Sequence, residues 1–281
     1  MQVNGIFYNV FDDHFHLRKD GLFLDAVRSF KKAGGTAFNL VNLPDYTISH
    51  AGYYEKLYEI TVSLSEAVRK ELNVPVVTTL GPYPLDFFFF KNAGMDPVEE
   101  MKKGVDLAIG EFIEGNCQCI GEIGTPHFDV DPDARAKIYE VLEYCFSRCA
   151  DAGSPVMLHT EDLDSTSLRR ICTSAGSAGL DPGRVIKHHA TSEVFRNDCC
   201  IIPSVPASRS AVRDACSTGK PFMLESDYVD DRQHPQRVLP PDSVPKRSLM
   251  ISQEFPNYEE IFAQAFVELP ERLYGLEYKT L

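Results

Sequence analysis

The sequence is poor in basic residues and has no long apolar run. Its 28 Lys and Arg residues stand against 41 Asp and Glu residues, which gives a formal net charge of −13. An acidic surface repels the phosphate backbone of nucleic acids, so tight non-specific binding to DNA or RNA is not expected. No apolar segment approaches the roughly 20 residues that a helix needs to cross a bilayer, and the first residues lack the basic and apolar regions of a signal peptide. We therefore expect a cytoplasmic protein without a membrane partner.

The cysteines do not have the spacing of a known metal or redox motif. Eight cysteines occur, and no two of them form a CxxC pair. This excludes a zinc ribbon and a thioredoxin-like motif. We interpret the cysteines as small buried side chains in a reducing compartment rather than as a disulfide framework.

The remaining composition, with 43% hydrophobic and 25% charged residues, is that of an ordinary globular protein. Short apolar runs alternate with amphipathic stretches through nearly the whole sequence, which predicts strand and helix units around a parallel sheet. Helical patterns lie around residues 22–30, 54–68 and 138–145. The expected strands lie near residues 8–14, 36–43, 74–81, 117–123, 154–159, 184–189, 199–203 and 221–227.

Eight strands in this order predict an α/β fold, a TIM-type (β/α)8 barrel, with one domain that spans residues 1–281. Such a barrel takes roughly 250 residues, and its strands are buried on both faces and therefore continuously apolar. Periodicity alone would also allow a doubly wound open sheet. The polar stretch 229–247 contains four prolines and is predicted to be a long loop after the last strand.

Polar side chains recur at the predicted C-terminal ends of these strands. The first strand ends in His14-Phe15-His16, and residues i and i+2 of a strand point to the same side. Two neutral imidazoles that share a side are half of a divalent metal site. Glu122 lies between two glycines in an apolar strand, and a buried carboxylate needs a cation, a partner or a raised pKa.

Three later strands add further candidates. His159 ends the fifth strand, and Asp227, which shares its side with Glu225, ends the eighth. The sixth strand ends in His188-His189, of which strand alternation lets one face the barrel axis. Barrel enzymes place their chemistry at this end of several strands. Imidazole and carboxylate ligands suit Zn²⁺, Mn²⁺, Fe²⁺ or Mg²⁺, and a shared carboxylate would make a two-metal site.

The strings HFH, GEIG, LHTE, KHHATSE and LESD, in this order, resemble the TatD-related metal-dependent hydrolases of the amidohydrolase superfamily. The longer strings GEIGTPHFDVD and LESDYVDDRQHP are most similar to the archaeal TatD-like branch. The resemblance implies a barrel with two divalent metal ions and phosphodiester hydrolysis, including DNase activity. It implies that the first ion is bound by His14, His16 and Asp227, that Glu122 bridges both ions, and that the second is bound by His159 and a histidine of the sixth strand.

The choice between the two adjacent histidines depends on which pattern is followed. The match of Thr191-Ser192-Glu193 to the related branch favours His189, whereas strand alternation favours His188, because His189 shares its side with Lys187. We expect His189 to be the ligand, since strand ends often twist or bulge.

Two departures from the family pattern concern the substrate. The family's GxHP string is here Gly81-Pro82-Tyr83-Pro84, and its HCF string is absent. We therefore expect a small phosphorylated or ester substrate, with nucleic acid as the weaker alternative, and hydrolysis by a metal-activated water whose proton Asp227 accepts. The substrate-binding candidates are His127, Tyr83 and Arg247. Alternatives are an amide, lactone or other ester hydrolase and, in another class, a non-catalytic metal-binding barrel.

Overall fold

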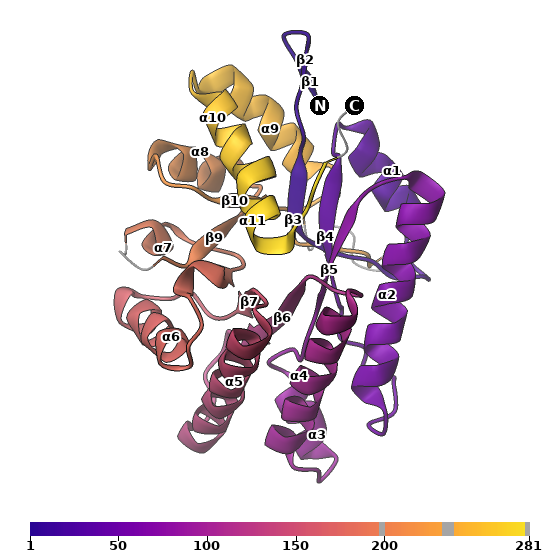
Figure 1. Ribbon diagram of the computed structural model, residues 1–281, viewed down its shortest axis with the longest axis vertical. Coiled ribbons are helices and arrows are strands. Elements are labelled where there is room, and N and C mark those ends of the chain that lie inside the picture. Colours follow the sequence, from indigo (N-terminus) through magenta and orange to yellow (C-terminus); the bar gives the residue numbers. More distant parts are fainter. Residues whose placement is uncertain (197–199, 232–238, 279–281) are drawn as a thin grey trace.

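The computed structural model describes residues 1–196, 200–231 and 239–278. Figure 1 shows a group of strands with helices packed around it. The strands are β1 (Gln2–Val3), β2 (Ile6–Phe7), β3 (Phe11–His16), β4 (Ala37–Val41), β5 (Val76–Leu80), β6 (Cys119–Gly124), β7 (Val156–His159), β8 (Val185–Lys187), β9 (Ile202–Pro206), β10 (Met223–Glu225) and β11 (Tyr228–Val229).

The main sheet is parallel and follows the order of the chain. Its strand order is β10-β9-β8-β7-β6-β5-β4-β3-β11. Tyr228 of β11 pairs with Phe15 of β3 at one end of the sheet, and β10, at the other end, lies against β3. From β3 to β10 each strand lies beside the next one in sequence, so the strand order does not reverse within the sheet and the sheet is not doubly wound. The predicted TIM-type α/β fold is confirmed.

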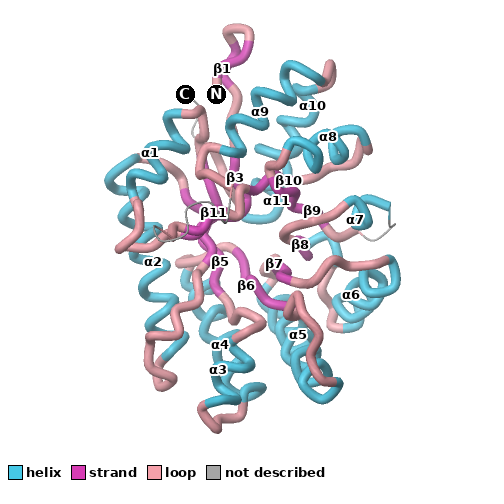
Figure 2. Tube along the Cα trace, turned by 180° about the vertical axis from the view of Figure 1, so that it is seen from behind, coloured by secondary structure: helices cyan, strands magenta, loops and turns pink. Residues whose placement is uncertain are grey.

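The helices form the outer layer, and the strands lie in the middle (Figure 2). No helix of the described residues is both long and apolar enough to span a membrane. The α-helices are α1 (Leu24–Lys32), α2 (Tyr53–Leu72), α3 (Asp86–Asn92), α4 (Pro97–Glu114), α5 (Pro132–Ala152), α6 (Ser165–Ser177), α7 (Ser192–Arg196), α8 (Arg209–Ser217), α9 (Ser243–Glu254), α10 (Tyr258–Ala263) and α11 (Leu269–Tyr274).

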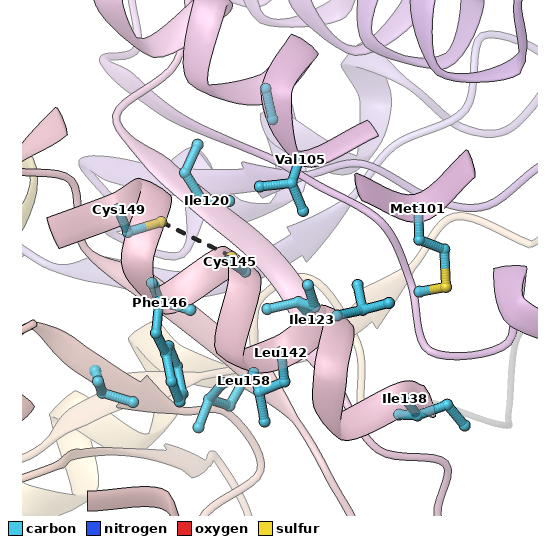
Figure 3. Close-up of a cluster of buried hydrophobic side chains, with 14 of the residues drawn as sticks. Met101, Val105, Ile120, Ile123, Ile138, Leu142, Cys145, Phe146, Cys149 and Leu158 are labelled. Atoms are coloured by element: carbon cyan, nitrogen blue, oxygen red, sulfur yellow. Dashed lines mark hydrogen bonds between the residues drawn. The ribbon is translucent and has the colours of Figure 1, made fainter. Parts of the chain in front are cut away.

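Helix α5 illustrates how the sequence sets both the bounds and the packing of an element. The Asp131 side chain caps its N-terminus by accepting from the Ala134 amide, and Gly153, with φ 73°, ends it in the left-handed conformation. Its apolar face lies against β6 and β7 in a buried cluster (Figure 3). The side chains of this contact include Leu142, Cys145, Phe146, Ile120, Ile123 and Leu158.

The structure corrects several expectations. The β1–β2 hairpin was not predicted, and β9 (Ile202–Pro206) begins and ends three residues later than the expected strand at 199–203. Lys246 and Arg247 lie in helix α9 rather than in the long loop. Pro245 is compatible with this helix because the first turn needs no intrahelical amide donor. Six cysteines are free as expected, but Cys172 is disulfide-bonded.

Candidate metal centre

Two imidazoles of β3 meet at the C-terminal end of the barrel. His14 and His16 are both buried, and their Nε2 atoms lie 3.1 Å apart. The Nδ1 atom of His16 lies 2.9 Å from the Val41 carbonyl oxygen. A carbonyl can only accept, so the His16 proton belongs on Nδ1 and the lone pair of Nε2 faces His14. This is the arrangement in which a metal-binding histidine is held by a backbone acceptor.

Glu122 of β6 is the centre of the cluster. Its carboxylate oxygens lie 3.7 Å from His14 Nε2, 3.8 Å from His16 Nε2, 3.1 Å from His159 Nδ1 and 3.6 Å from His188 Nε2. Nitrogen and oxygen ligands bind a zinc-like ion at about 2.0–2.2 Å, so ligand atoms on one ion lie roughly 3–4 Å apart. The spacing around Glu122 is therefore that of a ligand set.

The glycines on either side of Glu122 are required by the packing of β6 against β7. Gly121 and Gly124 have φ values of 148° and 147°, which only glycine adopts readily. A Cβ atom at either position would overlap the carbonyl oxygen of Met157 or His159. The glycines on either side of Glu122 therefore allow the close approach of the neighbouring backbone of β7.

The structure brings His188 rather than the preferred His189 into the cluster. The buried His188 ring stacks on the His14 ring at a centroid distance of 3.8 Å. The chain leaves strand geometry after Lys187, and His189, with φ 53°, has an exposed side chain. The Nδ1 atom of His188 lies 2.9 Å from Oε1 of Glu225, which directs Nε2 toward Glu122.

Asp227 completes the cluster from the turn after β10. Its φ of 49° is left-handed, and its Oδ1 atom lies 3.9 Å from His14 Nε2 and 3.8 Å from His16 Nε2. The side chain is 32% exposed, so it lies between the buried imidazoles and the solvent at the mouth of the barrel. Among the described residues, two groups have ligand atoms close enough to hold one ion, and both include His14: His14, His16 and Asp227, and His14, Glu122 and His188.

The electrostatics of the cluster suit divalent cations. Burial, and then the neighbouring His188, lower the pKa of His14 well below its usual value, which favours the neutral imidazole that binds metals. Burial also raises the pKa of Asp227 well above its usual value, and the charges of Glu225 and Glu122 act in the same direction. A cation among these carboxylates would reverse that repulsion. The residues present therefore fit a divalent metal.

The three substrate-binding candidates differ in position. The Tyr83 hydroxyl lies 3.3 Å from His159 Nε2, and the exposed His127 ring lies 5.8 Å from the His159 ring. Arg247 lies on α9, where its guanidinium contacts the sulfur of Met250 at 3.7 Å. The structure brings Tyr83 and His127 to the cluster and does not bring Arg247 there.

Sequence reasoning missed the buried carboxylates that support the cluster. Oδ1 of Asp12 accepts from the amides of His14 at 3.3 Å and Ser226 at 2.9 Å, and thereby joins β3 to the turn after β10. Glu225 accepts from the His189 amide at 2.8 Å and contacts His188. The position of Glu225 on the same side of the strand as Asp227 could have indicated its role. No sequence pattern, however, links Asp12 or Glu225 to its partner on another strand.

Imidazoles and carboxylates gathered at the C-terminal ends of parallel barrel strands define a class, the metal-dependent hydrolases with an amidohydrolase-type barrel. The chain belongs to the TatD-related DNase family, whose model matches residues 11–275. The family predicted from the motifs is thereby confirmed, and this family generally uses divalent metals.

Individual relatives agree with this assignment. The chain is 28% identical over 280 residues to "Uncharacterized protein MJ1127" of Methanocaldococcus jannaschii, with 95% of this chain and 96% of the relative covered. A TatD-like protein from Archaeoglobus fulgidus has a TM-score of 0.65 at 17% identity and covers 95% of this chain and 100% of its own. The TatD homologue YjjV of Escherichia coli has a TM-score of 0.64 at 14% identity, with 95% and 98% covered. At these identities the two solved structures show the fold alone.

Proposed function

We propose that this chain hydrolyses small phosphoesters at a centre that holds two divalent cations. The observation that carries the proposal is the position of Glu122, whose two oxygens lie 3.1–3.8 Å from nitrogens of four histidines. One carboxylate surrounded by four imidazoles fits a bridging ligand better than a structural ion pair, because neutral histidines would not offset its charge.

Each cation would be held by residues of different strands. His14, His16 and Asp227 would hold one ion, and His159 and His188 the other, with Glu122 shared between them. When bound, such ions lower the pKa of a water molecule and neutralise charge on the phosphoryl oxygens.

The protein's own residues would position the substrate and move the proton. In hydrolysis the water oxygen bonds to phosphorus, the P–O ester bond breaks, and the leaving group departs as an alcohol after it takes up the proton that the water has lost. The carboxylate of Asp227, whose side chain is partly exposed at the mouth of the barrel, would accept the proton of the attacking water. Burial, followed by the charges of Glu122 and Asp227, raises the pKa of Tyr83, so its hydroxyl stays protonated and can donate to a phosphoryl oxygen.

Charge favours a small substrate over long DNA. The chain carries a net charge of −13, and the rim loops at 81–85 and 125–131 contain no Lys or Arg. An extended phosphate backbone is held mainly by such cations. A single phosphate, in contrast, can be neutralised by the metal ions alone.

The test combines metal analysis with a substrate panel. Protein purified without added metal is analysed for Zn, Mn, Fe and Mg, and the metal-loaded protein is assayed on bis(4-nitrophenyl) phosphate, 4-nitrophenyl phosphate, 4-nitrophenyl acetate and a lactone. We expect about two ions per chain and the highest kcat/KM on a phosphoester. A preference for the acetate or the lactone would favour the ester or lactone hydrolase alternative, and bound metal without turnover of any compound would favour a non-catalytic barrel.

A further inference from the structure

A pocket lies at the N-terminal ends of the barrel strands, away from the candidate metal centre. Its lining includes Thr36 and Pro75, which directly precede β4 and β5, and Phe7 of the β1–β2 hairpin, which projects from the body of the molecule (Figure 1). The histidines of the metal centre lie at the opposite ends of the strands. The volume of this basal pocket is about 760 Å³, and small-molecule sites typically enclose roughly 300–1,000 Å³.

Part of the lining of the basal pocket is apolar. Val74, Val76 and Leu276 contribute side chains that are otherwise buried in the core, and Pro75 lies between the two valines in the chain. Phe7, which is 53% exposed, adds uncovered apolar surface. Burial of apolar surface is favourable in proportion to its area, so this lining favours a ligand with an apolar body.

The basal pocket also contains two positive charges that have no carboxylate partner among the described residues. The guanidinium of Arg69, on α2, is partly buried and donates from Nη2 to the Val76 carbonyl oxygen at 2.7 Å and to the Thr78 hydroxyl oxygen at 3.2 Å. Its Nε and Nη1 groups donate to no atom of the described chain. Lys31, at the end of α1, donates to the Leu72 carbonyl oxygen at 2.8 Å. Arg69 therefore keeps N–H donors for a ligand.

The stabilisation of helix ends does not account for Arg69. Basic side chains near the C-terminus of a helix commonly offset its last carbonyl groups, and Lys31 does so at the end of α2 by binding Leu72. Arg69 also lies in the last turn of α2, but its hydrogen bonds go to β5 instead. Burial lowers the pKa of Arg69, and the charge of the nearby Glu66 acts in the opposite direction without cancelling this effect. An anionic ligand would offset this partly buried charge.

The charged side chains of the basal pocket leave one positive charge. Lys31 and Arg69 are positive, and Glu277, the remaining charged side chain of the lining, is negative. The whole chain, in contrast, carries a net charge of −13. A carboxylate has a single negative charge at neutral pH and balances the pocket, whereas a phosphate monoester has about −1.5 to −2.

We propose that the basal pocket is a second binding site, for a small carboxylate with an apolar body. Arg69 binds the carboxylate group, and Lys31 adds a second positive charge beside it. Phe7 and Leu276 cover the apolar body. The site lies at the opposite end of the barrel from the metal centre, so binding there does not depend on whether the chain hydrolyses phosphoesters.

The test measures the binding of three compounds to the full chain by isothermal titration calorimetry. 4-Phenylbutanoate has both the carboxylate and the apolar body, 4-phenylbutan-1-ol lacks the charge, and acetate lacks the body. Hydrogen bonds to charged groups and buried apolar area both contribute to affinity, so we expect the acid to bind once per chain and at least about tenfold more tightly than either of the others. Equal affinities of the acid and the alcohol, or of the acid and acetate, overturn the proposal.

Matched substitutions locate the bound acid. We expect Arg69→Gln to weaken binding of 4-phenylbutanoate about tenfold, because it removes a charged hydrogen-bond donor. Lys31→Gln should weaken it about threefold, because Lys31 is exposed and its charge is screened. Lys70→Gln and Lys32→Gln are the controls, since each removes an exposed neighbouring charge that does not line the pocket, and both should leave the affinity unchanged.

Lys31→Gln keeps the proposal testable if Arg69→Gln does not fold, because the side chain of Lys31 is exposed. Equal effects of Lys31→Gln and Lys32→Gln would overturn the site. Loss of binding in His16→Ala would also overturn it, since the acid would then lie at the metal centre. Binding that appears only after deletion of residues 279–281 would do the same, because the end of the chain itself would then be the occupant.

Discussion

At the scale of single residues, Glu122 carries the largest share of the proposed chemistry. Glu122→Gln keeps the shape of the side chain but removes the charge that would separate two cations. Loss of a residue that only hydrogen-bonds to a metal ligand lowers metal affinity about 10–100-fold. We therefore expect loss of the bridging charge to lower metal affinity at least about 100-fold and to abolish hydrolysis. Metal titration by calorimetry measures this directly. Unchanged metal binding in this variant would make Glu122 a structural residue.

The two adjacent histidines provide an internal comparison. His188 is buried beside Glu122, whereas the side chain of His189 is exposed. We expect His188→Ala to lower metal affinity and kcat/KM by at least about tenfold, a minimum set by the effect of losing an outer-shell partner. His189→Ala should leave both within about twofold. The reverse order would restore the interpretation in which His189 is the ligand.

At the scale of elements, the buried Asp86 joins the loops after β4 and β5. Its carboxylate accepts hydrogen bonds from the Tyr83 amide and from the hydroxyls of Tyr46 and Tyr54. Burial raises the pKa of Asp86 to about 7. The folded state then holds a proton that the unfolded chain, with a pKa near 4, releases. The contribution of this proton to the free energy of unfolding is fully present below about pH 4 and is lost as the pH rises through about 7.

We therefore expect the free energy of unfolding of the wild type, relative to Asp86→Asn, to fall between pH 5 and pH 7. The slope is at most about 1.4 kcal/mol per pH unit, because one proton is involved. Urea unfolding of both proteins at pH 5, 6, 7 and 8 measures the difference. Independently of pH, the amide should cost about 1–3 kcal/mol, because it cannot accept from all the donors around Asp86. A difference that does not change with pH would show that Asp86 does not titrate in this range.

Strand periodicity left a barrel and a doubly wound sheet open, and the polar residues at the strand ends, together with the family resemblance, favoured the barrel and indicated most of the cluster. His14, His16, Glu122, His159 and Asp227 each follow or end an apolar run, and parallel strands bring such ends to one edge. The contacts that support them join residues far apart in the chain. Examples are Asp12 with Ser226, His188 with Glu225, and Asp13 with Tyr274 at 2.6 Å. Periodicity along one strand contains no information about such pairs.

The position of His188 shows a second limit of sequence patterns. Strand alternation correctly indicated that His188 and His189 face opposite sides, but the preference for His189 relied on a twist or bulge at the strand end. The structure instead ends β8 at Lys187 and turns the exposed His189 away with a left-handed φ of 53°. A backbone conformation that glycine usually adopts could not be read from a histidine in the sequence.

At the scale of the whole molecule, the net charge of −13 favours a small substrate over long DNA. Each phosphate of DNA that a protein neutralises contributes about −0.9 to the slope of log affinity against log salt. If the metal centre engages a single phosphate, this slope should be close to −1, and kcat/KM at 0.15 M salt should be higher for a dinucleotide than for duplex DNA per scissile bond.

The alternative to this expectation is that the basic side chains of α8 and α9 bind the phosphates of long DNA. Arg213 is paired with Glu254 at 2.7 Å and 2.8 Å, while Arg209 lies near Arg247 and lowers its pKa after the larger effect of burial. Arg247→Gln should leave both the salt slope and the preference for the dinucleotide unchanged, because the structure does not bring Arg247 to the metal centre. The opposite result would be efficient cleavage of long DNA at 0.15 M salt, with a salt slope that Arg247→Gln reduces by about one. It would show that α8 and α9 bind DNA phosphates.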